Sequence, residues 1–273
     1  MNFWETLFIQ PLVNGLLVFN GVFGNLGVAI IALTAFIRII LLPVTLPSMR
    51  AMQKMKDLSP EIAKLKQKHK DDKARLMQAQ ADLYKSKGVN PAAGCLPQIV
   101  QLIILFALVG VFNLFATGNP IENVNKFAYP ALRLTDGLNT QFLYLDLTKP
   151  DVFRIPEIPL PIPGIFLITA ALTQLLSSKM LMPAVEVEEK EAKKTKEKTD
   201  DMMASMQKQM LYLFPLMTIF IGFQFASGLV LYWLVLSGFQ MIQQYAISGW
   251  GGLVSWRNGL ASWLNKLNLV KSN

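Results

Sequence analysis

One arginine lies inside an apolar run near the N-terminus. The stretch ALTAFIRIILLPVTLPSM, residues 32–49, carries Arg38 among residues that otherwise suit lipid. Arginine stays protonated whatever its surroundings, and a charge at mid-membrane costs about 2.5–3.5 kcal/mol on insertion scales. Such a residue must face a buried acid or a water-filled cavity, where it would attract an anionic group.

No acid lies within an apolar run to pair with this cation, because every Asp and Glu falls in a polar stretch or near the N-terminus. We therefore expect Arg38 to line a hydrated groove whose fixed charge is unpaired. Two alternatives stay open: carbonyls and glutamine side chains satisfy Arg38 in a closed bundle, or the glutamines join helices to one another. The uncharged polar residues of the apolar runs are Thr34, Gln98, Gln101, Gln174, Ser177, Ser178, Gln224, Ser227, Ser237 and Gln240.

The composition indicates a membrane protein. The 273 residues are 52% hydrophobic and 16% charged, with a formal net charge of +8, whereas soluble domains are about 25% charged. A single cysteine (Cys95) excludes an internal disulfide framework, and a single histidine (His69) disfavours a His-based zinc or catalytic site. We expect no cofactor, no metal and no enzymatic reaction.

Arg38 and the glutamines lie in segments that we expect to be membrane helices. About 20 apolar residues are needed to cross the hydrocarbon core. The sequence therefore predicts an all-α integral membrane protein with five transmembrane helices, at residues 23–46, 96–116, 162–181, 211–225 and 228–247.

The distribution of Lys and Arg predicts the orientation, because cytoplasmic connections are rich in them. Residues 47–95 contain eleven, 182–210 six and the tail at 248–273 three, whereas 117–161 contain four and the stretch before the first span none. We expect an outside N-terminus, a cytoplasmic C-terminus and an extracytoplasmic loop at 117–161. Residues 1–22 are expected to form an interfacial amphipathic segment, with an additional span as the alternative.

The first cytoplasmic loop, residues 47–95, has helical periodicity on both sides of a polar turn at HKDD, residues 69–72. This pattern predicts an antiparallel helical hairpin. A basic surface that bears methionines suits a polypeptide partner or anionic lipid headgroups, and a solvated hairpin without a partner is the alternative. The residues expected to contact a partner are Met52, Met55, Lys56, Lys64 and Lys68. The loop at 182–210 is expected to be a charged linker, and the tail at 248–273 an amphipathic helix on the inner leaflet.

Three functions use an unpaired cation in a half-membrane groove: an anion transporter, an anion channel, and a device that shelters polar segments of another polypeptide during membrane entry. A transporter should show internal repeats or paired discontinuous helices, and the sequence shows neither. The basic hairpin directly after the arginine-bearing span favours the polypeptide client. Transport of an anion or small solute through an Arg38 site remains the alternative.

Four motifs resemble the YidC membrane protein insertase family in order and spacing. The motifs are GNLGVAIIALTAFIRIILLP from Gly24, LSPEIAKLKQKHKDD from Leu58, LYKSKGVNPAAGCLPQIVQL from Leu83 and ASGLVLYWLVLSGFQMIQQY from Ala226. The chain is similar to the five-span form without a large extracytoplasmic domain. It has ASGL before the last span, where the family usually has Pro-Ala-Gly-Leu.

The resemblance implies that Arg38 is the groove arginine, that Gln101 and Gln174 line the groove, and that Trp233 lies in the same cavity. Thr34 and Gln98 complete the expected client-binding set. It also implies a hairpin at residues 48–90 that receives nascent membrane proteins with short acidic or polar translocated segments, in a bacterial cell membrane. The Sec translocon and the ribosome are left open as further partners, and nucleic acid binding is not expected.

Overall fold

The computed structural model describes residues 2–69, 72–90, 96–156, 161–181, 212–213, 215–254 and 256. The chain divides into two compact units. The first comprises Met1–Thr45, Leu96–Gln174 and Phe214–Phe239, and the second comprises Leu46–Cys95, Leu175–Leu213 and Gln240–Asn273. Each unit is described by itself below.

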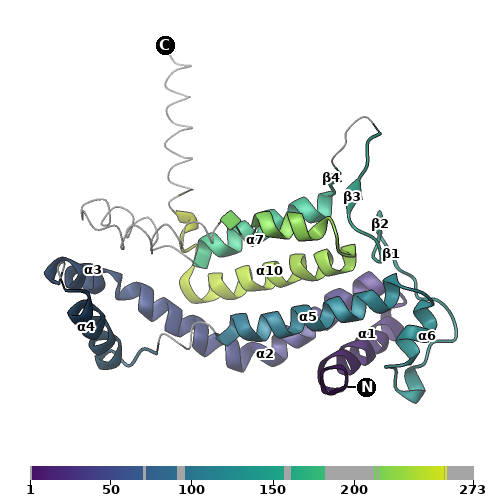
Figure 1. Ribbon diagram of the computed structural model, residues 1–273, viewed down its shortest axis with the longest axis horizontal. Coiled ribbons are helices and arrows are strands. Elements are labelled where there is room, and N and C mark those ends of the chain that lie inside the picture. The colour runs from purple at the N-terminus through teal and green to yellow at the C-terminus, as the bar shows by residue number, and fades with distance from the viewer. Residues whose placement is uncertain are drawn as a thin grey trace, which may run out of the picture. The chain divides into compact units, whose positions relative to one another are not determined.

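Helices dominate the described residues (Figure 1). By length and composition, three of the described helical segments could cross a membrane: Glu5–Phe23, Leu26–Met55 and Ile99–Ala116, while Ile165–Met180 is a shorter apolar helix. The helical elements are η1 (Glu5–Ile9), α1 (Gln10–Phe23), α2 (Leu26–Asp57), α3 (Ser59–Lys68), α4 (Lys73–Ser86), α5 (Leu96–Ala116), α6 (Pro120–Asn125), η3 (Pro130–Leu132), α7 (Ile165–Leu181) and α10 (Ser227–Ser248).

The helix bounds differ from the predicted spans mainly at α2 and α7. Helix α5 has the predicted bounds, and α10 is one residue longer at each end than the predicted 228–247. Helix α2 continues past residue 46 through Pro47 to Asp57, because the Met, Lys and Gln residues that follow favour helix. For the predicted span at 211–225, residues 212–213 and 215–222 are helical among those that the structure describes. The loop at 182–210 and the tail beyond residue 256 lie outside the described residues.

The N-terminal helix α1 packs into the core of the first unit. Its Val13, Leu16 and Leu17 are buried in one apolar cluster with side chains of α2, α5 and α10. The length and composition of Glu5–Phe23 suit the alternative of an additional span, and the interfacial placement of residues 1–22 stays a prediction.

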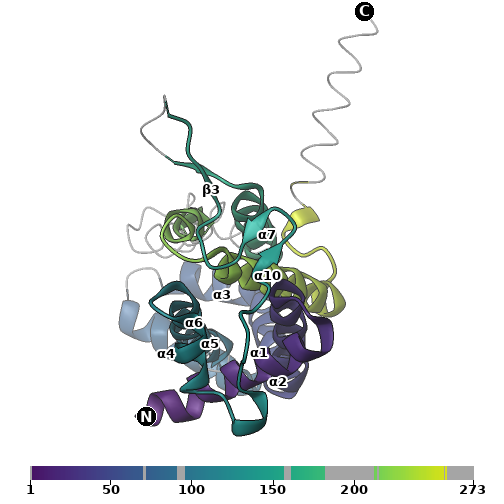
Figure 2. The same cartoon turned by 90° about the vertical axis from the view of Figure 1, so that its right-hand side faces the viewer.

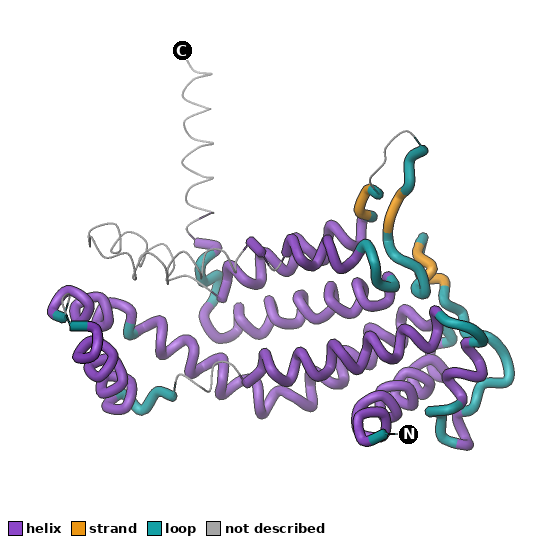
Figure 3. Tube along the Cα trace, viewed as in Figure 1, coloured by secondary structure: helices purple, strands orange, loops and turns teal. Residues whose placement is uncertain are grey.

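Among the described residues, strands occur only in the connection between α5 and α7 (Figure 3). Strand β1 (Gln141–Phe142) pairs antiparallel with β2 (Leu145–Asp146), and β3 (Val152–Phe153) pairs antiparallel with β4 (Ile162–Pro163). The pairing of Ile162 and Pro163 explains why α7 begins at Ile165, three residues after the predicted start.

This connection holds the beginning of α10 through backbone hydrogen bonds. The Ser227 N–H donates to the Lys149 carbonyl at 2.7 Å, and the Gly228 N–H donates to the Leu147 carbonyl at 3.0 Å. The Ser227 hydroxyl also donates to the Asp146 carbonyl at 3.0 Å. These bonds satisfy N–H groups that a helix start leaves without an intrahelical partner. A Cβ on Gly228 would lie 2.3 Å from the Phe112 ring, so glycine allows α10 to approach α5 closely.

Two asparagines attach the same connection to α1 and α2. The buried Asn14 side chain donates to the Phe127 carbonyl at 2.8 Å and accepts from the Tyr129 N–H at 2.7 Å. Asn25 donates to the Gln141 carbonyl at 2.8 Å and caps α2 by accepting from the Gly27 N–H at 3.0 Å. The connection is therefore a folded part of the first unit, bonded to the helices that it joins.

A buried carboxylate caps the start of α7. Asp151 is 3% exposed, and it accepts hydrogen bonds from the Leu167 N–H at 2.8 Å and from the Tyr144 hydroxyl at 3.0 Å. A negative charge at a helix N-terminus is favoured by the helix dipole. A Cβ on Gly164 would lie 1.8 Å from an Asp151 carboxylate oxygen, so only glycine leaves room for this cap.

In the second unit, α3 and α4 contact each other. Lys87, just after α4, forms an ion pair with Glu61 in the first turn of α3 at 2.8 Å. The end of one helix therefore lies beside the start of the other, as in an antiparallel pair. Asp72 caps α4 by accepting from the Arg75 N–H at 3.0 Å. Near the end of α7, the Lys179 ammonium lies 5.4 Å from the centre of the Trp256 ring.

We expect Asp151→Ala to destabilise the protein by about 1–2 kcal/mol, the range of a lost N-cap, because it removes the acceptor of the Leu167 N–H and of the Tyr144 hydroxyl. Thermal unfolding in detergent micelles measures this. Asp136→Ala, at an exposed position of the same connection, is the matched control and should leave Tm unchanged. Equal Tm values for the two variants would contradict the capping role.

Candidate functional site

Arg38 lies deep along α2. It follows Leu26, the first residue of the helix, by twelve positions (38 − 26), which corresponds to about 18 Å at a rise of about 1.5 Å per residue. Its side chain is 6% exposed. A cation at this depth is far from the N-terminal end of α2, and protein atoms surround most of it.

The guanidinium binds a neutral amide. Its Nη2 donates to Gln101 Oε1 at 2.5 Å, and Gln101 Nε2 donates to the Tyr232 hydroxyl at 2.6 Å. The amide orientation follows from chemistry, since the opposite one would direct the NH₂ group at another donor. One glutamine of α5 thus joins α2 to α10, which run beside it in Figures 1 and 2. We call Arg38, Gln101 and Tyr232 the arginine cluster.

The charge of the arginine cluster has no acidic counterpart among the residues that the structure describes, where Arg38 takes part in no ion pair. A guanidinium carries five N–H donors, and among the described residues Gln101 is its one acceptor. The remaining donors are available to water or to an anionic group. The bonds also show that a glutamine partly satisfies Arg38, as in the closed-bundle alternative.

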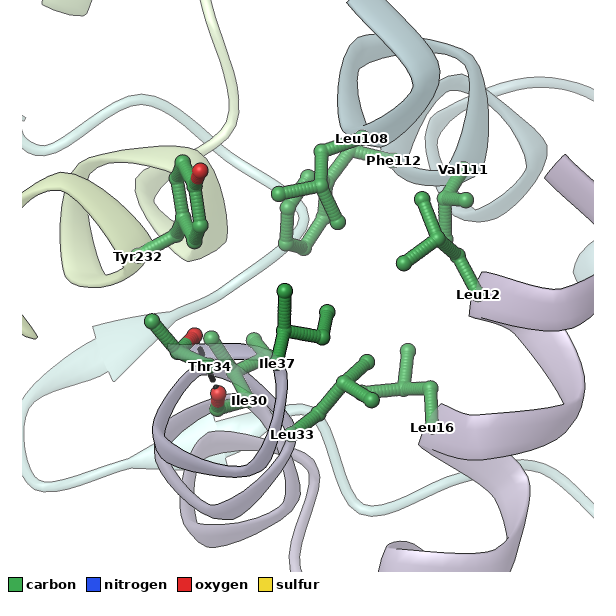
Figure 4. Close-up of a pocket in the computed structure, with 10 residues that line it drawn as sticks. All are labelled: Leu12, Leu16, Ile30, Leu33, Thr34, Ile37, Leu108, Val111, Phe112 and Tyr232. Carbon is green, nitrogen blue, oxygen red and sulfur yellow. Dashed lines mark hydrogen bonds between the residues drawn. The ribbon is translucent and has the colours of Figure 1, made fainter. Parts of the chain in front are cut away.

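Apolar side chains border the arginine cluster toward the start of α2. A cavity of about 10 Å³ lies among α1, α2, α5 and α10, which is room for one water molecule at most. Figure 4 shows its lining, which includes Leu33, Leu108 and Phe112. Thr34 also lines it, but its hydroxyl donates to the Ile30 carbonyl of its own helix at 2.6 Å. Thr34 therefore adds little free polarity to the site.

Two other predicted site residues lie in the first unit without a bond to Arg38 among the described contacts. Gln174 accepts from the buried Ser237 hydroxyl at 2.7 Å and so joins α7 to α10. Trp233, next to Tyr232, packs against the apolar core and is partly buried. Their place in a client groove stays a prediction.

The remaining predicted residues belong to the second unit, except Gln98, which belongs to the first. Met52 and Met55 near the end of α2 are half-buried, and Lys64 and Lys68 on α3 are exposed. The side chains of Lys56 and Gln98 lie outside the described residues. The structure therefore brings Arg38 and Gln101 together, and the other predicted contacts remain untested.

Tyr232 is the member of the cluster that the sequence prediction missed. It stands in LVLYWLVL, residues 229–236, an apolar run in which an aromatic side chain is expected to serve as core. A buried tyrosine usually needs a partner for its hydroxyl. A tyrosine within an apolar run is therefore the signal in the sequence from which a polar contact could have been predicted.

Comparison with known proteins identifies the family of this chain. The model of the family described as 60Kd inner membrane protein matches residues 18–251. The chain belongs to this family. A protein named Membrane protein insertase YidC from Fusobacterium nucleatum subsp. nucleatum is 37% identical over 224 residues, which cover 82% of this chain and 86% of the relative.

Proteins of the same name from Geobacter sulfurreducens and Rickettsia rickettsii are 30% and 32% identical over 248 residues, which cover 90% of this chain. The match covers 38% and 39% of their own lengths, so the chain spans well under half of these longer relatives. Membership of the 60Kd inner membrane protein family and the apolar helices make the chain an all-α, multi-pass protein of the bacterial membrane.

We expect Gln101→Leu and Tyr232→Phe to be energetically coupled, because Gln101 donates to Tyr232. Gln101→Leu should cost about 1.5–3 kcal/mol, as for a hydrogen bond to a charged group, and Tyr232→Phe about 0.5–1.5 kcal/mol. The double variant should lose less than the sum, by about 0.5 kcal/mol or more. Unfolding in detergent micelles gives all four values.

The control cycle combines Gln101→Leu with Ser237→Ala, which belongs to the separate Gln174 contact. Its two effects should add to within about 0.5 kcal/mol. Additive effects of Gln101→Leu and Tyr232→Phe would show that the cluster is not one unit.

Proposed function

We propose that the chain is a membrane protein insertase in which Arg38 holds the polar segment of a client during membrane entry. The observation that carries the proposal is a buried guanidinium whose acceptor among the described residues is the neutral amide of Gln101. Membership of the 60Kd inner membrane protein family and the names of the relatives support the same function.

A client carboxylate would compete with the Gln101 amide for Arg38. An anionic acceptor adds charge–charge attraction that the neutral amide does not supply, and a charge crossing hydrocarbon otherwise costs several kcal/mol. Arg38 therefore lowers the barrier for an acidic segment, while Gln101 keeps the cation hydrogen-bonded when no client is present. No bond is made or broken in this process.

The apolar lining beside the cluster suits a groove that ends partway through the membrane. Side chains such as Leu33 and Phe112 enclose a space of about 10 Å³, so a polar segment would stop at the level of Arg38. Its apolar helix would then leave sideways, because burial of apolar surface in lipid is favourable.

The remaining parts of the proposal concern topology and partners. We propose an outside N-terminus and a cytoplasmic C-terminus, with Gln98, Gln174, Trp233 and Thr34 near the client path. The pair of helices α3 and α4 would meet nascent membrane proteins on the cytoplasmic side, where Met52, Met55, Lys56, Lys64 and Lys68 offer apolar and basic contacts. The Sec translocon and the ribosome are open as further partners.

Arg38→Ala should lower insertion of a single-span client with an acidic translocated segment by about tenfold or more, since a loss of about 1.4 kcal/mol is a factor of ten. Arg38→Lys should retain most of the activity because it keeps the charge. Liposomes that contain the purified variants, with protease protection of the client as the readout, measure this. A client with a neutral segment is the control, and full insertion of the acidic client by Arg38→Ala would refute the electrostatic role.

Gln101→Glu should impair insertion of the acidic client without a loss of structure. A carboxylate at the position of the amide would pair with Arg38 and compete with the client, so insertion of the acidic client should fall while that of the neutral client stays near normal. The same liposome assay compares both clients, and anion flux in these liposomes tests the transporter alternative. If the Gln101→Glu variant inserted the acidic client as well as the wild type does, Arg38 would not need to lack an acidic partner.

A further inference from the structure

An exposed apolar patch lies on the two strand pairs that precede α7. Leu143, Tyr144 and Phe153 are 78%, 44% and 47% exposed. The rings of Tyr144 and Phe153 stack with centres 6.1 Å apart and an interplanar angle of 19°. Ile155 is 41% exposed. We call these four residues the hairpin patch.

Leu143 has a left-handed backbone conformation, which is unfavourable for leucine. It is the first residue of the two-residue turn between β1 and β2, and its φ is 55°. This position of a hairpin turn is usually taken by Gly, Asn or Asp, because L side chains are strained there. A strained leucine that is 78% exposed is buried little by the described residues, and an apolar surface outside the first unit would account for its apolar side chain.

Tyr144 is oriented with its polar end inward. Its hydroxyl donates to the Asp151 carboxylate and accepts from the Phe166 N–H at 3.1 Å. Burial is the main cause that raises the pKa of Tyr144; the Phe166 N–H lowers it and the neighbouring Asp151 raises it, with a net rise, so the hydroxyl remains a donor near neutral pH. The exposed part of Tyr144 is thus its apolar ring, which suits contact with lipid.

The patch continues into an apolar face of α7. Tyr144 contacts Phe166 with ring centres 5.7 Å apart, and Ile165, Ile168 and Leu172 are 63%, 42% and 55% exposed. These three residues follow one another at steps of three and four, which places them on one face of the helix. In a membrane protein, an exposed face of this kind contacts acyl chains.

The length of α7 brings the patch to the membrane. Its 17 residues rise about 26 Å at about 1.5 Å per residue, less than the hydrocarbon thickness of about 30 Å. Residues directly before α7 therefore lie at the membrane boundary when the helix spans it. Arg154, exposed between Phe153 and Ile155, supplies a cation suited to lipid phosphate.

We propose that the hairpin patch inserts into the leaflet at which α7 begins, with Leu143, Tyr144, Phe153 and Ile155 among the upper acyl chains and Arg154 at the phosphates. With the proposed topology this is the outer leaflet. The patch fixes the depth of a short helix by extending its apolar surface. The proposal rests on the exposed apolar surface of the first unit and does not depend on whether the chain inserts clients.

The test uses a cysteine reporter in the full chain. Cys95→Ser provides a cysteine-free background, and Leu143→Cys, Ile155→Cys or Asp136→Cys is then labelled with an environment-sensitive nitrobenzoxadiazole dye. Each protein is reconstituted in vesicles of phosphatidylcholine and phosphatidylglycerol, with or without lipid that carries a nitroxide on the upper acyl chain. Asp136 is exposed in the same connection and serves as the water-facing control.

We expect blue-shifted emission and strong nitroxide quenching at positions 143 and 155, because interfacial side chains lie about 5–10 Å into the headgroup–acyl boundary. The label at position 136 should remain water-exposed. Leu143 is 78% exposed, so its replacement should preserve the fold, which an unchanged Tm before labelling verifies. Quenching at position 143 or 155 no stronger than at 136 would overturn the proposal and favour a protein partner for the patch.

Discussion

The hydrogen bonds of one buried cation make the positions of three helices interdependent. Arg38 on α2 binds Gln101 on α5, which binds Tyr232 on α10. A guanidinium cannot neutralise itself by losing a proton, and an unsatisfied charge in an apolar interior is costly. Any sliding of one helix along another would break this chain of bonds, so the register of the three helices is a requirement of the charge as well as of apolar packing.

The connection between α5 and α7 maintains that register from one end. It bonds to α1 through Asn14 and to α2 through Asn25, while Asp151 caps α7 and the carbonyls of Leu147 and Lys149 hold α10. Buried backbone N–H and C=O groups almost always have hydrogen-bond partners. Here the α5–α7 connection and the helices that it joins provide these partners for each other. The rigid end and the arginine cluster together leave α10 little freedom to shift relative to α2 and α5.

The sequence revealed the parts of this arrangement that depend on composition. A charge within an apolar run drew attention to Arg38, and the same reasoning singled out Gln101. It missed Tyr232, because its ring fits the apolar period and its hydroxyl partner is 131 residues away. The strand pairs were not predicted, since two-residue strands are too short to show a period of two. The span predicted at 23–46 ends where the apolar run ends, whereas α2 continues without interruption into the predicted helical loop as far as Asp57.

The attachment of α10 has a consequence for how this protein can vary. Two of the three bonds at its start join backbone to backbone, at Lys149 and Leu147, and a carbonyl is the same whatever side chain its residue carries. An exposed position such as Lys149, whose side chain is 76% accessible, can therefore accept other amino acids without moving the helix. A change in the number of residues there would displace those carbonyls. Exposed positions of this segment are accordingly tolerant of substitution, whereas the segment as a whole is sensitive to insertion or deletion.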